Sequence, residues 1–220
     1  MSEKLSCALD LSGPFASFAV AGGGKILLSE SFVLQNRNNV AFFKSFFSAL
    51  SEAKIEVSEI DKWIVGTGPG SFTGLRIASS FVSGIIYDTD KIALGLSSVF
   101  PIALGIDSSF GENVGILFPC SKDTLYLCSL ALNKNGSWGM QKNPECIAKK
   151  GLLSIKTCSK FVSLSAPGEE NSLMQFIDDG TPISFLNRFP IEKMLCDFDG
   201  YYTDIKDLLY LRPPSLTVKI

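Results

Sequence analysis

The chain of 220 residues contains no histidine. A Ser-His-Asp triad or a Cys-His pair needs imidazole as its base, and the usual zinc and iron sites need imidazole as a ligand. The lack of histidine therefore excludes most hydrolase mechanisms and the common imidazole metal centres. We expect neither a bound metal nor a cofactor.

An excess of positive charge is also missing, because 20 Lys and Arg residues stand against 22 Asp and Glu residues, for a net charge of −2. Tight binding of nucleic acid requires a basic surface that neutralises phosphate groups. The sequence therefore predicts that any role with RNA is indirect and shared with another subunit.

Long hydrophobic runs are absent as well. Ser, Lys, Gly or Asp interrupts every apolar stretch before it reaches the roughly 20 residues that a membrane-spanning helix needs. The N-terminal segment MSEKLSCALDL lacks the charged region and long apolar region of a secretory signal. We therefore expect a cytoplasmic protein without membrane contact.

The cysteines form no C-x-x-C pair and no regular metal-binding spacing. In a reducing compartment, such cysteines are single thiols, mostly buried or half-buried. The six cysteines are Cys7, Cys120, Cys128, Cys146, Cys158 and Cys196.

Apolar residues, in contrast, are abundant, at 46% against 19% charged residues, and phenylalanine alone occurs 17 times. This composition is apolar for a soluble protein, so we expect part of the apolar surface to face a partner. A helix starting at Asn38 or Asn39 concentrates the aromatic residues, half of which we expect to pack on a sheet. Its apolar positions are Val40, Phe42, Phe43, Phe46, Phe47 and Leu50.

The order of predicted elements indicates an α/β fold that begins with a βββαβα unit, a mixed sheet with helices on one side. The first-lobe elements are strands 5–11, 15–21 and 26–33, a helix from 38 or 39, strand 61–65, helix 71–87 and strand 92–96. A second copy of such a unit would complete a two-lobed body.

Signals for the second lobe are weaker, so we predict that it is reduced. It would contain strands 114–118, 124–132 and 161–164, short helices 148–155 and 171–177, and a loop over 133–144. The predicted domains are therefore residues 1–105 and a smaller, divergent lobe over residues 106–220.

A glycine-rich stretch, IVGTGPGSFTGLRIASSF at residues 64–81, separates a strand from a helix. A phosphate-binding P-loop ends in Gly-Lys-Ser/Thr, whereas here Gly74 precedes Leu75, so that motif is excluded. The dinucleotide fingerprint G-x-G-x-x-G is only weakly matched, because Ser71 stands at its third glycine and three strands precede it.

Spacing alone favours a sharp turn at Pro69 and Gly70 into a helix capped by Ser71 or Thr73. An anion site at the start of this helix, assisted by Arg76, stays open as an alternative.

The helix after this turn is apolar on more than one side, which indicates burial on both sides. One side would meet the sheet, and the other would meet a helix or another protein. Small residues between the apolar ones would let a partner helix approach closely. These small residues are Gly74, Ala78, Ser79, Ser80, Ser83 and Gly84.

The run GTGPGSFTGLRIA at residues 66–78 resembles the signature of the bacterial TsaB (YeaZ) family. SCALDLSG at residues 6–13, ALGLSSVF at 93–100 and LLYLRPP at 208–214 are similar to further motifs of that family. The signature positions are Gly66, Gly68, Pro69, Gly70, Ser71, Phe72, Thr73, Gly74 and Arg76.

This resemblance implies the actin/sugar-kinase/Hsp70-like (ASKHA) fold and a platform subunit without catalytic residues. It implies a heterodimer with the catalytic subunit TsaD, joined by the ATPase TsaE, that threonylcarbamoylates adenosine 37 (t6A) of tRNAs reading ANN codons. It also implies a possible homodimer when the chain is alone. With the apolar pattern, it places the partner interface at Phe43, Phe47, Phe72, Leu75, Arg76, Ala78, Ser79 and Ser83.

The sequence departs from the family pattern in two places. PCSKDTLYL from Pro119 lacks the family's aspartate and arginine and keeps only Tyr126, and NRNNV at residues 36–40 replaces an acidic-histidine pair. Contacts that depend on those side chains are therefore in doubt, whereas the glycine motif is complete.

Two alternatives stay open. One is a small ASKHA-type kinase or ATPase that holds a nucleotide with Asp10, Ser12 and the glycine-rich turn. Such an enzyme also needs a phosphate loop from the second lobe, for which the sequence offers only turns at Asp107 and at 178–181. The other is a homodimeric interaction protein.

Overall fold

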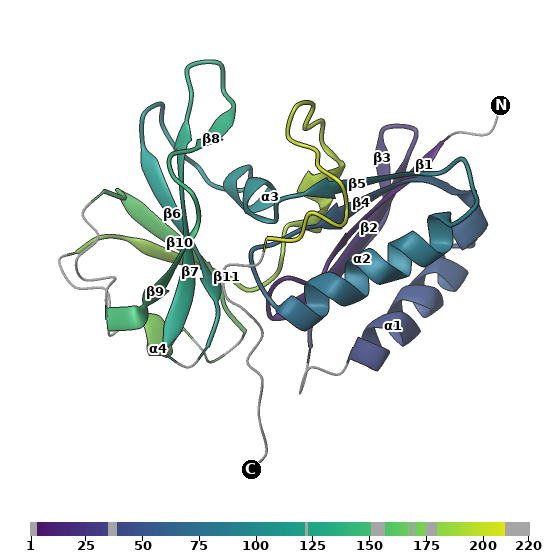
Figure 1. The fold of residues 1–220 in the computed structure, drawn as a ribbon, viewed down its shortest axis with the longest axis horizontal. Helices are drawn as coiled ribbons and strands as arrows, with labels where there is room; N and C mark the ends of the chain where they lie inside the picture. The colour runs from purple at the N-terminus through teal and green to yellow at the C-terminus, as the bar shows by residue number, and fades with distance from the viewer. Residues whose placement is uncertain are drawn as a thin grey trace, which may run out of the picture.

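The computed structural model describes residues 4–34, 39–121, 123–150, 157–166, 168, 170–174 and 180–209. The chain forms two β-sheets that lie side by side, and a layer of two helices covers the far side of the first sheet (Figure 1). The fold is mixed α/β, as predicted. None of the described helices is long and apolar enough to cross a membrane.

The first sheet has the strand order β3-β2-β1-β4-β5. β1, β2 and β3 form an antiparallel meander, whereas β4 and β5 run parallel to β1. The bounds are β1 Leu5–Asp10, β2 Phe15–Gly22, β3 Lys25–Val33, α1 Asn39–Glu52, η2 Val57–Glu59, β4 Ile60–Gly66, α2 Phe72–Ile86 and β5 Ile92–Leu96. This order confirms the predicted βββαβα unit.

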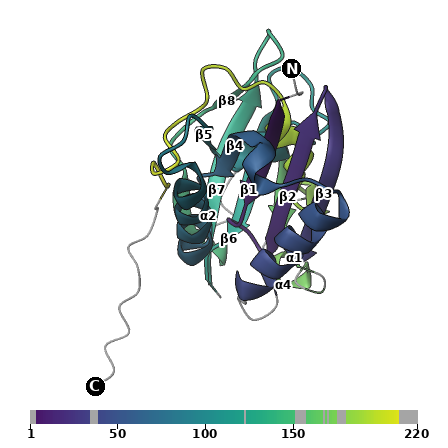
Figure 2. The same ribbon diagram turned by 90° about the vertical axis from the view of Figure 1, so that its right-hand side faces the viewer.

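Both α1 and α2 lie on the same face of this sheet, as the two perpendicular views show (Figures 1 and 2). Because successive side chains of a strand point to opposite faces, Cys7 and Leu9 of β1 pack in the core beneath these helices. Ala8, between them, packs in the core shared with the second sheet. The first sheet is therefore buried on both faces.

The second sheet has the strand order β11-β10-β6-β7-β8, with β9 paired to the remaining part of β7. Its elements are β6 Asn113–Pro119, β7 Thr124–Leu132, β8 Trp138–Met140, β9 Glu145–Ala148, β10 Lys160–Leu164, α4 Asn171–Met174 and β11 Ile183–Leu186. Among the described residues of this lobe, α4 is the only α-helix, so the helical layer is much smaller than in the first lobe.

Three predictions for this lobe need correction or completion. Ala148 ends strand β9 instead of starting a helix, because its segment pairs with β7, and residues 151–156 lie outside the described part. β8 interrupts the predicted loop over 133–144. Helix α4 begins at Asn171 as predicted, but residues 175–179 lie outside the described part.

Two short helices that the sequence did not reveal lie between the sheets, α3 (Val99–Ala103) and the 3₁₀ helix η4 (Ile191–Leu195). Their apolar side chains join the core that contacts both sheets, so the lobes share one hydrophobic interior. After η4 the chain crosses back to β5, where Gly95 and Thr203 exchange backbone hydrogen bonds of 2.8 and 2.9 Å. The domain boundary at residue 105 therefore stays a prediction.

Candidate functional site

The glycine loop, residues 66–71 between β4 and α2, brings backbones together. A Cβ atom on Gly66 would lie 1.9 Å from Oδ2 of Asp10, and one on Gly70 would lie 2.1 Å from the carbonyl oxygen of Ser12. One turn into α2, a Cβ on Gly74 would lie 1.9 Å from the carbonyl oxygen of Leu11. Only glycine allows the loop and the helix to approach the end of β1 this closely.

Backbone N–H groups of this loop are used within the chain. Ser71 N donates to the carbonyl oxygen of Ser12 at 2.7 Å, and Gly68 N donates to Oγ of Ser98 at 3.2 Å. Ser71 also caps α2, since its side chain accepts from Gly74 N at 3.3 Å, which settles the choice between the two predicted caps. A phosphate would have to displace these bonds, because a cradle needs free N–H donors.

Asp10, which the kinase alternative requires, is 1% exposed and lies at the end of β1. Its Oδ1 accepts from Ser12 N at 2.8 Å and from Ser12 Oγ at 2.6 Å, and its Oδ2 accepts from Ser98 Oγ at 2.6 Å. Burial raises the pKa of Asp10, and the hydrogen bonds from Ser12 and Ser98 oppose that rise in part. The carboxylate therefore ties β1 to the segment after β5.

The second-lobe turns do not complete a nucleotide site in the described residues. Asp107 is exposed in the loop between α3 and β6, and its carbonyl oxygen accepts a hydrogen bond from the Lys160 ammonium. Asp178 lies outside the described part. No group of three potential metal-binding side chains was found among the described residues.

All six cysteines are free thiols, as the sequence predicts. Burial raises the pKa of Cys128 to about 12 and raises the pKa of Cys7 further. Because the thiolate is the nucleophilic form, these two thiols are chemically inert near neutral pH.

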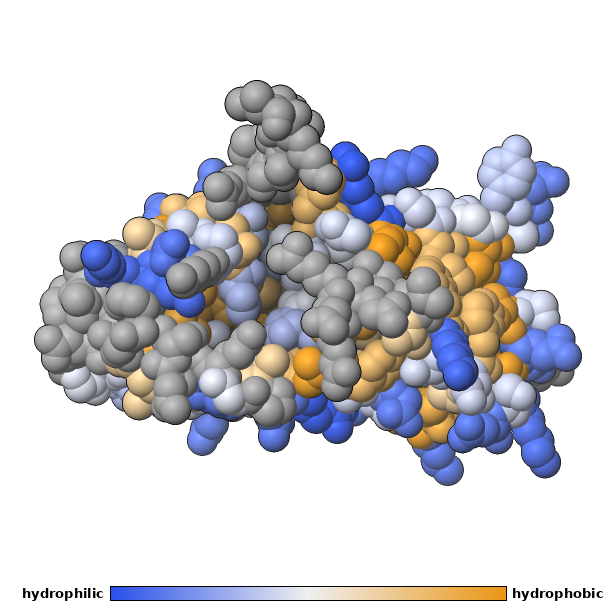
Figure 3. Space-filling model, turned by 90° about the horizontal axis from the view of Figure 1, so that it is seen from below, coloured by the Kyte–Doolittle hydropathy of each residue, from blue (hydrophilic) through white to orange (hydrophobic). Residues whose placement is uncertain are grey.

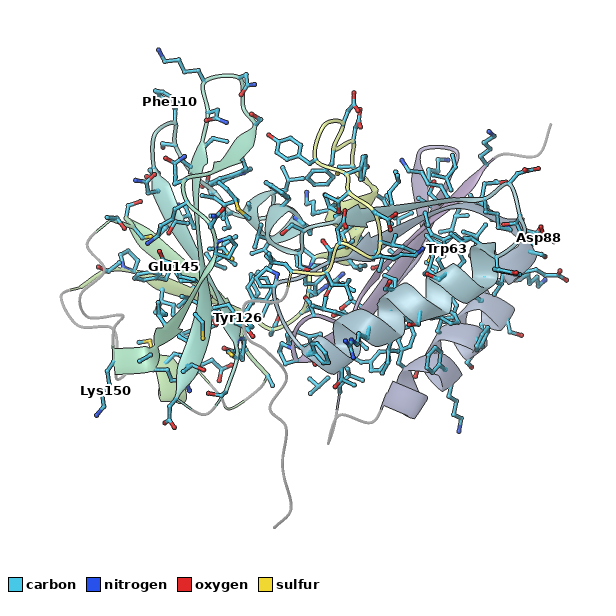
Figure 4. The ribbon with its side chains drawn as sticks, viewed as in Figure 1. Trp63, Asp88, Phe110, Tyr126, Glu145 and Lys150 are labelled. Carbon is cyan, nitrogen blue, oxygen red and sulfur yellow. The ribbon has the colours of Figure 1, made fainter. Side chains whose placement is uncertain are left out.

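Tyr126, the residue kept from the family's mid-chain motif, is only 7% exposed and belongs to the core between the sheets. It lies on β7, opposite Phe118 of β6, and its position near the middle of the molecule can be followed in Figure 4. Its side chain therefore packs the interior of the second lobe.

An apolar surface extends over α1 and α2, where it can be seen in the right half of the space-filling view (Figure 3). Phe47 is 49% exposed, and Phe43 is half-buried beside it. Both rings contact Phe81 of α2, with centroid distances of 6.1 and 5.1 Å. Aromatic rings that bridge two helices and stay open to solvent suit contact with another protein.

Five of the predicted interface residues lie on this side of the molecule or at its edge. Arg76 is exposed and its guanidinium lies 3.9 Å from the ring centre of the half-buried Phe72. Together with newly recognised neighbours, they define the outer helix surface, which consists of Phe43, Phe47, Phe72, Arg76, Ile77, Ser80, Phe81, Ser83 and Gly84.

The other three predicted interface residues are buried within the chain itself. Leu75 and Ala78 are fully buried and Ser79 is 7% exposed, because this arc of α2 packs on the strands of its own sheet. Helical spacing places Ser80 and Gly84 on the opposite arc, and a Cβ added to Gly84 would meet nothing within 4 Å. The spacing of Leu75, Ala78 and Val82 was the available signal for the buried side.

Comparison with known proteins gives one matching family model and several structures of similar fold. Residues 38–125 match the family model described as TsaD, tRNA N6-adenosine threonylcarbamoyltransferase. An uncharacterized protein from Pseudomonas aeruginosa with similarity to peptidase YEAZ superposes with a TM-score of 0.72 at 20% identity, over 95% of this chain and 100% of that chain. The superposition shows a YeaZ-like fold, which is the fold that the resemblance to the TsaB (YeaZ) family implies.

A second structure, YeaZ from Pseudomonas aeruginosa, superposes with a TM-score of 0.66 at 20% identity, over 87% of this chain and 89% of that chain. A Bacteroides thetaiotaomicron protein described as having an actin-like ATPase fold gives a TM-score of 0.52 at 9% identity, over 89% and 97% of the two chains. The predicted ASKHA-type fold is therefore confirmed. No curated protein matches the sequence.

The segment that matches the family model runs from α1 into β7 and contains the glycine loop and the whole outer helix surface. The C-terminal motif starts beside the same loop, since Leu209 N donates to the carbonyl oxygen of Thr67 at 2.9 Å. Residues 210–214 of that motif lie outside the described part.

Proposed function

We propose that the chain is a non-catalytic subunit that pairs with a TsaD homologue in the threonylcarbamoylation of adenosine 37 (t6A) of tRNAs reading ANN codons. A TsaE homologue would join this assembly, and tRNA would be reached mainly through the partner. The observation that carries the proposal is the outer helix surface, which leaves aromatic side chains open within the segment that matches the TsaD family model.

The physical basis for pairing is the make-up of this surface. Phe43 and Phe47 supply apolar area. The outward side of α2 has little side-chain bulk at Ser80, Ser83 and Gly84. A helix from a partner can approach this side closely and bury the rings. The TsaB-like chain then contributes a docking face instead of reactive groups.

Several features support a role without chemistry of its own. The chain has no histidine, Asp10 is held by hydroxyl groups of the chain, and burial raises the pKa of two thiols. With a net charge of −2, the chain also lacks the basic surface that would bind tRNA tightly by itself.

The direct test is co-expression with the TsaD homologue of the same genome, followed by measurement of complex affinity. We expect Phe47→Asp to weaken the complex at least about tenfold, because a charge would be buried in an apolar contact. The matched control is Phe110→Asp, which makes the same change at a ring that is 61% exposed on the second lobe, away from α1 and α2 (Figure 4).

No stoichiometric complex of the unaltered chain, or equal weakening by both substitutions, would contradict this interface. Adding TsaD to a homodimer of this chain tests the alternative of a homodimeric interaction protein. If the two assemblies share the outer helix surface, TsaD dissolves the homodimer.

Calorimetry with ATP and magnesium tests the kinase alternative on the isolated chain. We expect no micromolar binding, because Asp10 and the N–H groups of Gly68 and Ser71 already have partners within the fold. Micromolar binding would favour a nucleotide-dependent enzyme over the proposed platform.

A further inference from the structure

A cavity of about 260 Å³ lies apart from the outer helix surface, since none of its lining residues belongs to α1 or α2. Its lining residues come from α3 and the residue after it, the β7–β8 hairpin and the loop after η4, which lie in the upper middle of Figure 1. Sites for drug-sized ligands usually measure about 300 to 1,000 Å³. The size of this cavity therefore suits a group no larger than one long amino-acid side chain.

Four of the nine residues that line the cavity are aromatic. Phe100 comes from α3, Trp138 from β8, and Phe198 and Tyr201 from the loop after η4. The ring centroid of Phe100 lies 4.7 Å from that of Tyr201 and 6.3 Å from that of Phe198. The Tyr201 hydroxyl donates to the carbonyl oxygen of Trp138 at 3.1 Å. These contacts fix the walls before any ligand arrives.

Asp197 supplies the charge of this site, since it is the only charged side chain among the described residues that line the cavity. The side chain is exposed, and its Oδ1 accepts from the backbone N–H of Asp199 at 3.1 Å. Asp199 is itself exposed and adds a second negative charge nearby. Aromatic faces and a carboxylate both attract cations, and the rings also receive the alkyl part of an organic cation.

We propose that this aromatic pocket binds a small organic cation, an alkylguanidinium or alkylammonium group, with Asp197 as the counter-charge. The proposal does not depend on the proposed role in tRNA modification, because none of the pocket residues belongs to the outer helix surface or the glycine loop.

Tryptophan fluorescence gives a direct readout. The chain has two tryptophans, and Trp63 is fully buried in the core beneath the helices, so a change on titration reports on Trp138. The probes are Nα-acetyl-arginine amide and its neutral counterpart Nα-acetyl-citrulline amide. We expect a dissociation constant on the order of 1 mM for the arginine compound and at least about tenfold weaker binding of the citrulline compound.

Two substitutions and one control test the residues. Asp197→Asn keeps the hydrogen bond to Asp199 and should weaken binding of the arginine compound about fivefold. Asp123→Asn removes the same charge from an exposed position on the second lobe and should leave binding unchanged. Leu104→Lys places an ammonium group at the partly exposed rim and should abolish binding.

Each variant is first checked for an unchanged thermal unfolding midpoint. Equal binding of the arginine and citrulline compounds, equal behaviour of the Asp197 and Asp123 variants, or no fluorescence change with any cation would overturn the proposal.

A blocked Gly-Arg-Gly peptide identifies the source of the cation. Tighter binding than the single amino acid indicates a side chain carried by a protein partner, whereas equal binding indicates a free small cation. Either result supports the pocket.

Discussion

The glycine loop and the outer helix surface both adjoin the start of α2, but the loop is tightly packed and the surface is open to solvent. In the loop, Gly66 and Gly70 bring backbone against Asp10 and Ser12 with no space left for a side chain. On the outer surface, Phe47 is half exposed and Gly84 faces open space. The glycine loop thus packs tightly against the end of β1, whereas the proposed docking face lies on α1 and α2.

The two glycines inside α2 give the strongest contrast. We expect Gly74→Ala to lower the free energy of unfolding by about 3 kcal/mol or more, because its Cβ would lie 1.9 Å from the carbonyl oxygen of Leu11. Denaturant titration measures this change. A loss below about 1 kcal/mol would show that α2 shifts easily away from β1.

The pH dependence of stability tests the role of the buried Asp10 carboxyl group beside the glycine loop. The pKa of Asp10 in the folded chain is raised above its ordinary value of 3.8, so the folded state binds the proton more tightly than the unfolded state does. The stabilisation from this proton is complete below pH 3.8 and is lost as the pH rises through the folded-state pKa.

Asp10→Asn removes this titration. Relative to the Asn variant, the unaltered chain should therefore lose stability as the pH rises from about 3.8 toward neutrality. Denaturation at a series of pH values gives the difference in unfolding free energy. A difference that is constant over this range would mean that Asp10 titrates normally in the folded chain.

The smallest expected effect has the opposite sign. Gly84→Ala should raise the free energy of unfolding by about 0.5 to 1 kcal/mol, because alanine has the higher helix propensity and its methyl group meets no neighbour. The same denaturant titration serves as the measurement. Destabilisation by Gly84→Ala would remove the contrast between the two ends of α2.

The sequence predicted the first lobe well because its signals are local. Regular apolar spacing defined both long helices, and Ser71, one of the two predicted caps, caps the second one. The burial of Leu75 and Ala78 followed from the same spacing but was outweighed by the expectation of a partner. A sequence pattern that is apolar on all sides of a helix predicts burial of both sides. It does not tell which side packs on the sheet of the same chain.

Long-range contacts account for the features that were not predicted. Ser98 bonds to Asp10 from a position 88 residues away, and β9 forms because Glu145 to Ala148 pair with β7. The short helix η4 is stabilised by burial of Ile191 and Met194 between the sheets. None of these segments carries a periodic pattern long enough to be read without its neighbours.

The pairing of Gly95 with Thr203 has a consequence for association. A β-sheet can add a strand from another chain at an unpaired edge, and natural proteins commonly cover or blunt such edges. The segment around Thr203 pairs with β5 and so covers part of one edge of the first sheet. The other edge strand is β3, where the side chains of Ile26 and Leu27 are about half exposed. Addition of a strand to the first sheet should therefore begin at β3.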